Sequence, residues 1–254
     1  MNYNDLDIDN WKNLEINVDS LWLLGERDKK GKHSNIYHGN FIPQIPNQII
    51  RRFTKKNDIV LDVFMGSGTT LFESETLGRN FIGFDINGEI IEFVKSKMMD
   101  CDTIQYDIHN CDTTNTDEFE KNIDISLKKM NSQKVQLIIY HPPYLDIVKF
   151  TDRKEDLSHI SNLKEFISKF KIVLDNSLKY LEKNRYFAIV IGDVYKNSEV
   201  VPLSFYILDN IKRNFSVKLK GIIVKNIEGN RGKIGKENKW KYRSQYNVIK
   251  IEDN

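Results

Sequence analysis

Short apolar segments that alternate with longer amphipathic segments constrain the fold of this chain more than any other feature of its sequence. Each apolar segment is too short for a helix and is bounded by Gly, Pro, Asn or Asp, which predicts a buried strand. Such strands with helices between them form a parallel sheet that is covered on both faces. We therefore expect an α/β fold with a doubly wound, mostly parallel sheet. The expected strands are 59–64, 81–86, 103–107, 136–141 and 186–193, and the expected helices are 46–54, 71–78, 89–99, 162–181 and 202–214.

The composition is that of an ordinary globular chain. Its 254 residues are 40% hydrophobic and 29% charged, which is enough to bury one large core. The polar, acidic start MNYNDLDIDN is unlike a secretory signal, and no apolar run is long enough to span a bilayer. Two cysteines, Cys101 and Cys111, are present, and their spacing fits no metal knuckle. These features predict a cytoplasmic protein with no membrane partner and no metal site.

The chain shows no internal repeat, low-complexity tract or long Pro/Gly/Ser linker. We expect a single domain over 1–254, with an N-terminal extension over 1–40 and a basic loop over 226–246. Residues 211–250 hold 12 Lys and Arg against 2 Asp and Glu, whereas residues 1–210 hold 26 against 32. This concentration of positive charge is typical of a phosphate-binding surface, and a solvated basic face is the alternative.

The segment LDVFMGSGTT (61–70) places an acid and two glycines between an expected strand and an expected helix. Gly66 and Gly68 permit positive φ and let a ligand approach bare backbone, and the following helix offers free N–H groups to an anion. No Lys follows the glycines, so the segment is not a nucleotide-triphosphate loop. Leu71 stands where the dinucleotide fingerprint has its third glycine, which argues against a dinucleotide-dependent oxidoreductase.

Acidic residues end three successive expected strands, at Asp62, Asp85 and Asp107. In a doubly wound sheet the ligand binds at the carboxyl ends of the strands. An acid at the end of the second strand is placed to accept hydrogen bonds from ribose hydroxyls, and Asp107 is expected in the same crevice near an adenine amino group. The alternative for each acid is a helix cap or a turn residue.

The tetrapeptide His141-Pro142-Pro143-Tyr144 directly follows an expected strand. The two prolines cannot donate to a sheet ladder, and they hold the backbone extended with the Pro142 carbonyl pointing outward. A base taken out of its duplex needs a ring to stack on, such as that of Tyr144, and acceptors for its amino hydrogens. The alternative is a rigid turn with a packing tyrosine.

DVFMGSGTT resembles motif I of the amino-methylating DNA methyltransferases, Asp-x-Phe-x-Gly-Ser-Gly-Thr. HGNFIPQIPNQIIRRFT (38–54) resembles the segment that closes over the methionine end of their cofactor. The resemblance implies a Rossmann-like methyltransferase sheet, S-adenosylmethionine as the cofactor, and a role in restriction-modification. The cofactor-binding residues that we expect are Asn40, Phe41, Pro43, Asp62, Phe64, Gly66, Ser67, Gly68, Thr69, Asp85 and Asp107.

The His-Pro-Pro-Tyr tetrapeptide resembles motif IV of the same family, Asp/Asn/Ser-Pro-Pro-Tyr/Phe/Trp, here in the order motif I before motif IV. The resemblance implies that His141, Pro142, Pro143 and Tyr144 are catalytic. His141 departs from the usual first residue. A neutral imidazole accepts one hydrogen bond and a protonated one accepts none, so we expect activity to be lost at acidic pH. HPPYLDIVKFT followed by DLS favours cytosine N4 weakly over adenine N6 as the target.

The C-terminal segment interleaves basic residues, which bind phosphates, with aromatic residues, which stack on bases. With the resemblance, this pattern predicts contact with double-stranded DNA that carries a flipped target base. No larger target-recognition region is visible, which suggests a homodimer or a partner specificity chain. The expected DNA-binding residues are Lys225, Arg231, Lys233, Lys236, Lys239, Trp240, Lys241 and Arg243.

Two other functions remain open. Some RNA base amino-methyltransferases also use a Pro-Pro-Tyr motif, although the form of motif I and the upstream proline segment favour DNA. A non-catalytic DNA-binding protein that keeps the fold is the second alternative, because of His141.

Overall fold

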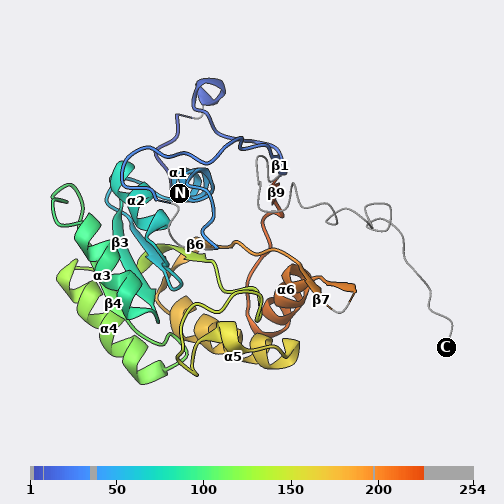
Figure 1. Cartoon of the computed structure of the whole chain (residues 1–254). Helices are drawn as coiled ribbons and strands as arrows, with labels where there is room; N and C mark the ends of the chain where they lie inside the picture. The colour runs from blue at the N-terminus through green and yellow to red at the C-terminus, as the bar shows by residue number, and fades with distance from the viewer. Residues whose placement is uncertain (1–2, 8, 35–38, 197, 226–254) are drawn as a thin grey trace, which may run out of the picture. The chain divides into compact units, whose positions relative to one another are not determined.

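The computed structural model describes residues 3–225 except 8, 35–38 and 197. The described residues divide into two units, a larger one within 3–17 and 28–220 and a smaller one within 18–27 and 221–225. The larger unit holds the sheet and the helices (Figure 1). In the smaller unit, β1 (Leu21–Trp22) pairs in parallel with β9 (Val224–Lys225).

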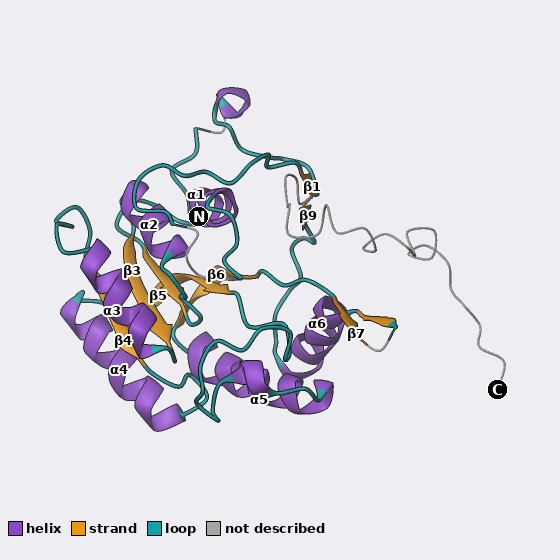
Figure 2. Ribbon diagram, viewed as in Figure 1, coloured by secondary structure: helices purple, strands orange, loops and turns teal. Residues whose placement is uncertain are grey.

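A five-stranded sheet forms the middle of the larger unit, in the order β4-β3-β2-β5-β6 (Figure 2). All four strand pairs are parallel. The chain builds outward from β2 through β3 to β4, then crosses back and adds β5 and β6 on the other side of β2. The strand order therefore reverses beside β2, which is where such sheets bind ligands. The strands are β2 (Ile59–Asp62), β3 (Asn80–Asp85), β4 (Tyr106–Asn110), β5 (Val135–Tyr140) and β6 (Leu181–Ile189).

Helices connect the strands and cover the sheet on both faces. Helix α1 contacts α2, β5 and β6, whereas α4 contacts α5, and α5 contacts α6. The helices are α1 (Gln44–Phe53), α2 (Thr69–Thr76), α3 (Gly88–Lys97), α4 (Thr116–Lys129), α5 (Leu163–Leu178) and α6 (Leu203–Asn214). Single turns of 3-10 helix occur at Trp11–Asn13 and Leu157–His159, and β7 (Val194–Lys196) and β8 (Glu199–Val201) form an antiparallel hairpin.

Asparagine side chains begin three of these helices. Asn87, Asn115 and Asn162 each accept a hydrogen bond from a backbone N–H in the first turn of α3, α4 and α5. Such caps satisfy donors that have no partner inside the helix. The sequence prediction of a helix over 162–181 thus corresponds to α5, with Asn162 as its cap rather than its first residue.

Alternating side chains of the strands pack on opposite faces of the sheet. On one face Leu61, Phe84 and Tyr140 pack with Phe119 of α4 and Phe170 of α5 in a continuous apolar core. The adjoining strand residues Val60, Phe81 and Ile139 are also buried completely. Because strands buried on both faces require two helical layers, the predicted doubly wound, mostly parallel α/β sheet is confirmed.

Several elements differ from the sequence prediction: the last strand, expected at 186–193, is β6 at Leu181–Ile189, and the β7–β8 hairpin was not predicted. The strand expected at 103–107 is wrong, because β4 runs from Tyr106 to Asn110 in register with Phe81 to Asp85 of β3. The polar residues His109 and Asn110 hid its end, yet a strand at the edge of a sheet tolerates polar side chains. Helix α4 was not anticipated at all. The single domain over 1–254 stays a prediction, and no helix among the described residues is long and apolar enough to cross a membrane.

Candidate active site

One pocket lies at the carboxyl ends of the strands in the larger unit. Every strand from β2 to β5 sends the residues that follow it, or its last residue, to the wall of this pocket. The loop before α1 and the loop after Tyr144 complete the wall. The lining residues are Gly39–Phe41, Val63–Gly66, Thr69, Asp85, Ile86, Cys111–Thr113, His141–Tyr144, Ile147, Val148, Phe150, Asp156 and Leu157.

Asp62 holds the glycine loop from beneath. Its Oδ1 accepts a hydrogen bond from the Phe64 N–H at 3.0 Å, and its Oδ2 accepts one from the Thr70 hydroxyl at 2.6 Å. Burial raises the pKa of Asp62 to about 7, against the effect of these hydrogen bonds. Asp62 does not line the pocket, and its hydrogen bonds hold the glycine loop in its conformation.

Gly68 meets two requirements that exclude a side chain. Its φ is +85°, a left-handed conformation that glycine adopts readily. A Cβ at Gly68 would also lie 3.1 Å from the Phe72 ring and 3.2 Å from a methyl group of Val94. Gly68 therefore lets the chain turn directly into α2 while α2 and α3 pack closely.

Asp85 joins the glycine loop to the next strand. It is the last residue of β3, and its two carboxylate oxygens accept hydrogen bonds from Gly66 N–H at 2.7 Å and Asn87 N–H at 2.8 Å. The side chain is buried and lines the pocket. Burial raises the pKa of Asp85 to about 6, while the two backbone hydrogen bonds act in the opposite direction.

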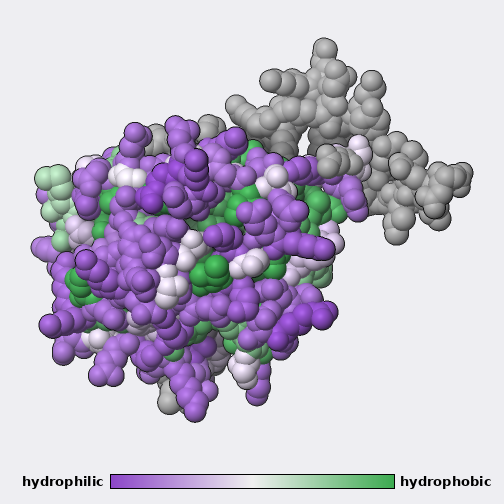
Figure 3. Space-filling view, turned by 90° about the horizontal axis from the view of Figure 1, so that it is seen from below, coloured by the Kyte–Doolittle hydropathy of each residue, from purple (hydrophilic) through white to green (hydrophobic). Residues whose placement is uncertain are grey.

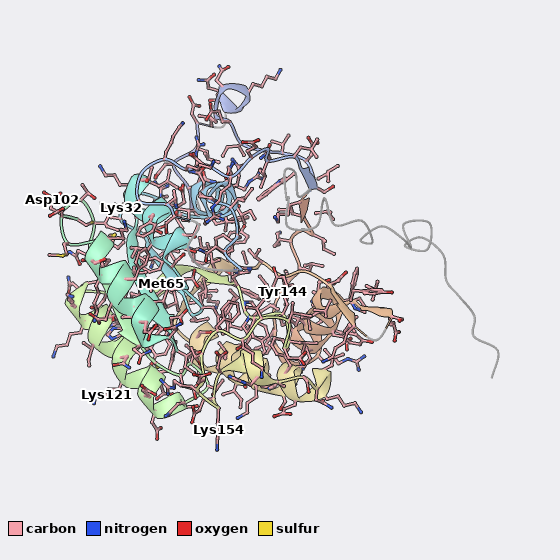
Figure 4. All side chains as sticks on the ribbon, viewed as in Figure 1. Lys32, Met65, Asp102, Lys121, Tyr144 and Lys154 are labelled. Atoms are coloured by element: carbon pink, nitrogen blue, oxygen red, sulfur yellow. The ribbon has the colours of Figure 1, made fainter. Side chains whose placement is uncertain are left out.

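The His-Pro-Pro-Tyr tetrapeptide begins where β5 ends. His141 Nε2 lies 3.2 Å from the Tyr144 hydroxyl, and the His141 ring lies against Phe41 with 4.6 Å between ring centroids. Burial raises the pKa of Tyr144 to about 12, so its hydroxyl stays protonated at neutral pH. Gly192 lies behind the ring, since a Cβ there would be 3.1 Å from Tyr144. In the view of Figure 4, Met65 and Tyr144 are drawn near the middle of the molecule, whereas Lys121 and Lys154 are drawn at its edge.

Ten of the fifteen residues predicted for catalysis and cofactor binding are brought together here. All four of the tetrapeptide residues line the pocket, as do Asn40, Phe41, Phe64, Gly66, Thr69 and Asp85. Ser67, Gly68, Asp62 and Pro43 do not line it. Ser67 Oγ accepts a hydrogen bond from the Asn40 amide, and Pro43 is the residue that precedes the first turn of α1.

Asp107 lies elsewhere, and the prediction that it ends its strand is wrong. It is the second residue of β4 and pairs with Ile82 in the middle of β3. Its carboxylate accepts hydrogen bonds from Ser126 at 2.9 Å and Lys129 at 3.2 Å, both on α4. Asp107 therefore fastens α4 to the sheet and does not line the pocket.

Asp112 occupies the position that the sequence analysis assigned to Asp107. It is the second residue after β4, is buried, and lines the pocket. Its Oδ1 accepts hydrogen bonds from the backbone N–H and the hydroxyl of Thr114, at 2.9 and 2.7 Å. The sequence Cys111-Asp112-Thr113 contains an acid just beyond a strand, which is a signal for a pocket residue. That signal can be read only when the end of β4 is placed at Asn110.

Of the predicted DNA-binding residues, the structure describes Lys225 and none of the others. Lys225 ends β9 in the smaller unit. Arg231, Lys233, Lys236, Lys239, Trp240, Lys241 and Arg243 lie outside the described residues. Among the residues that the structure describes, no three His, Cys, Asp or Glu side chains are grouped to hold a metal ion.

Part of the chain is similar in sequence to DNA methylases. Residues 2–96 match the family model described as DNA methylase. The chain is 36% identical over 114 residues to the type II methyltransferase M.MjaII of Methanocaldococcus jannaschii, which covers 43% of this chain and 22% of that protein. It is 57% identical over 44 residues to M1.MboII of Moraxella bovis, which covers 17% of each. It is 39% identical to M2.LlaDCHI of Lactococcus lactis over 26% of each chain.

These matched segments span about a quarter or less of the relatives' own lengths. At the level of the family, the predicted resemblance to the S-adenosylmethionine-dependent DNA amino-methyltransferases is confirmed. Among solved structures, a methyltransferase from Pyrococcus furiosus is similar with a TM-score of 0.46 and 14% identity, over 73% of this chain and 78% of that one. TrmN from Thermus thermophilus has a TM-score of 0.41 and 18% identity, over 60% and 39%.

Proposed function

We propose that this chain transfers the methyl group of S-adenosylmethionine to an exocyclic amino group of a base that is flipped out of double-stranded DNA. One observation carries the proposal. A single pocket is lined both by Asp85 with the glycine loop and by the His141–Tyr144 tetrapeptide, so two molecules that bind at these places meet. Holding two reactants together in line is the largest contribution that a protein makes to such a displacement.

The side of the pocket formed by the residues that end or follow β2 and β3 fits S-adenosylmethionine. Asp85 is a buried carboxylate at the end of β3, where an acid accepts hydrogen bonds from two ribose hydroxyls. Asp112 is the corresponding acid beyond β4 and takes over the adenine contact expected of Asp107. Asn40 and Phe41 line the same pocket from the segment that resembles the methionine-binding part of the family. S-adenosylmethionine, when bound, supplies an activated methyl group to an acceptor nitrogen.

The tetrapeptide prepares that nitrogen. His141 and the Pro142 carbonyl accept the amino hydrogens, which frees the nitrogen lone pair from conjugation with the base ring. Tyr144 stacks on the face of the flipped base. After transfer the nitrogen is acidic enough to lose its proton to water, so no dedicated general base is required.

The contact between His141 and Tyr144 is made by Nε2, so Nδ1 is the imidazole nitrogen that we propose faces the target amine. The neutral Tyr144 hydroxyl can accept from Nε2–H or donate to Nε2 at the observed 3.2 Å, and the first arrangement is the one that the proposal uses. With its proton on Nε2, neutral His141 keeps Nδ1 as an acceptor for the target amine. Protonation of both nitrogens removes the acceptor, which is why we propose a loss of activity in acid.

Finer points of the proposal come from the sequence. We propose cytosine N4 over adenine N6 as the target, and contact of the basic loop 226–246 with DNA phosphates. We also propose that a second copy of the chain or a partner specificity chain contributes to target recognition. The free thiols of Cys101 and Cys111 support a reducing, cytoplasmic setting.

The test is to incubate the protein with methyl-labelled S-adenosylmethionine and, in parallel reactions, unmethylated genomic DNA or total RNA, then digest each nucleic acid and separate the nucleosides. Label in N4-methylcytosine or N6-methyladenine is the expected result and identifies the target base. Label in RNA alone establishes an RNA methyltransferase. Cofactor binding without transfer to either nucleic acid establishes a non-catalytic DNA-binding protein.

A further inference from the structure

The loop that follows Tyr144 is fastened at both ends. We call residues 145–150 the strap. Near its start, Asp146 forms an ion pair with Lys196 of the β7–β8 hairpin, with Nζ–Oδ distances of 2.7 and 2.9 Å. At its end, the Phe150 N–H donates to Ser158 Oγ at 3.1 Å, and the Phe150 carbonyl accepts from the Asn87 amide at 3.3 Å. The strap is thereby tied to the hairpin, to α3 and to the 3-10 turn at Leu157–His159.

The backbone turns sharply where the strap begins. Leu145 has a φ of +53°, which is uncommon for a residue with a branched side chain, and its side chain is nevertheless buried. Residues in this conformation cost free energy and persist where packing around them requires it. Leu145 packs in the apolar core next to Tyr144, so the turn sends the following residues outward from the tetrapeptide.

The middle of the strap exposes apolar side chains. Ile147 is 54% exposed and Val148 is 39% exposed, although both also line the pocket beside Tyr144. Exposed Lys149 follows them. Because the strap is fastened on both sides, these two side chains are held at the surface instead of turning into the core. The face of the molecule shown in Figure 3 is mostly hydrophilic with small separate apolar areas, which is the pattern of an ordinary protein surface. Apolar residues that are exposed singly on that face need no functional explanation.

From this arrangement we propose that Ile147 and Val148 form a wedge that enters the base stack of DNA and fills the place of the flipped base. The inference rests on the proposed function. A base that leaves its duplex unstacks its neighbours at a cost of a few kcal/mol, and apolar side chains inserted between bases offset such costs. The wedge is adjacent to the ring that receives the flipped base, and Lys149 is next to it for a phosphate. The ion pair with Lys196 neutralises Asp146, the acid that precedes Ile147 in the chain, so that it does not repel the DNA backbone.

A role of Ile147 and Val148 as a wedge can be distinguished from a role as residues that only line the pocket. A side chain that stabilises the flipped state matters less when the target base is already unpaired. A side chain that binds the cofactor or the flipped base matters equally for paired and mismatched targets. The double substitution Ile147→Ala with Val148→Ala therefore affects matched DNA far more than mismatched DNA.

The experiment compares this double variant with the native chain and with Ile125→Ala, which removes an equally exposed apolar side chain on α4, 50% exposed and away from the pocket. The substrates are duplexes that contain the methylated site mapped with the native chain, one matched and one with a mismatch at the target base. A 2-aminopurine next to the target reports unstacking by fluorescence.

For the double variant we expect transfer to matched DNA to fall about tenfold and the fluorescence rise to be lost, with mismatched DNA restoring transfer to within about threefold of the native rate. Cofactor affinity and the Ile125→Ala protein stay unchanged. An equal loss on both duplexes, a loss of cofactor affinity, or no loss at all overturns the wedge while the native chain still methylates DNA. No transfer to DNA by the native chain contradicts the proposed function itself, and the wedge with it.

Discussion

The two sides of the pocket are built differently. On the cofactor side, the carboxylates of Asp62 and Asp85 are buried, and the two oxygens of Asp85 accept from the backbone N–H groups of Gly66 in the glycine loop and of Asn87. On the target side, the tetrapeptide is followed by a left-handed residue, Leu145, and by the exposed side chains of the strap. The cofactor side is already arranged for its ligand by hydrogen bonds within the chain. The target side presents apolar side chains that the described residues of the larger unit leave exposed.

This difference reflects the chemistry of the two proposed ligands. A small polar cofactor is recognised by hydrogen-bonding groups whose geometry is set before it arrives. A base is delivered by a duplex, whose own stacking must be broken and replaced. Changes on the cofactor side should therefore act on cofactor affinity, and changes on the target side should act on transfer. Four substitutions or titrations test this separation.

Tyr144→Ala should produce the largest loss on the target side. Removing the ring on which a base stacks is expected to lower the rate of transfer about a hundredfold, because stacking on an aromatic side chain contributes about 1–3 kcal/mol. Cofactor affinity, measured by calorimetry, should stay nearly intact. Tyr144→Phe keeps the ring and loses the contact with His141, so it serves as the matched control and should retain most of the activity. A parallel fall in cofactor affinity would show that Tyr144 does not belong to the base.

Asp85→Ala should do the reverse. It removes the carboxylate that accepts from Gly66 and Asn87 and leaves those N–H groups without their partner. Hydrogen bonds to a charged group contribute about 1.5–3 kcal/mol, so we expect cofactor affinity to weaken about thirtyfold. Equilibrium binding of DNA by the variant, measured without cofactor, should be unchanged. A normal cofactor affinity in this variant would exclude the ribose role of Asp85.

Gly192→Ala tests the position of the Tyr144 ring without changing the ring itself. The new methyl group would lie 3.1 Å from the ring, closer than a relaxed contact, so the ring must shift. We expect transfer to fall about tenfold, since small displacements at a reacting centre are costly. Gly88→Ala is a suitable control, because its Cβ would meet its nearest neighbour, Asn110, at an ordinary 3.5 Å. Equal activity of the two variants would show that Gly192 does not position Tyr144.

The last test concerns stability and leaves the rate of transfer aside, and it uses the titration of Asp62 on the cofactor side. Burial raises the pKa of Asp62 to about 7 from an ordinary value of 3.8. The folded state therefore favours the protonated acid, and the stability that this contributes is complete below about pH 4 and is lost as the pH rises through about 7. Urea unfolding of the cofactor-free protein between these pH values should show this decline, and Asp62→Asn should reduce it. The same slope in both proteins would mean that other groups control the titration.

Much of the fold followed from local patterns. The apolar strands β2, β3 and β5 are short, buried and bounded by breakers, so their places and the residues at their ends were predictable from the sequence. The glycines and the His141–Tyr144 tetrapeptide were visible for the same reason, because turns, strand ends and proline pairs are encoded in adjacent residues.

What only the tertiary structure decided depends on residues that are distant in the sequence. Asp107 and Asp112 both look like strand-end acids, and pairing with β3 alone determines that β4 continues to Asn110 and places Asp112 in the pocket. The strap is held by Lys196, 50 residues away from Asp146, and by Asn87, 63 residues away from Phe150. Strand register and contacts between loops are set by packing across the whole sheet, which no local pattern in the chain records.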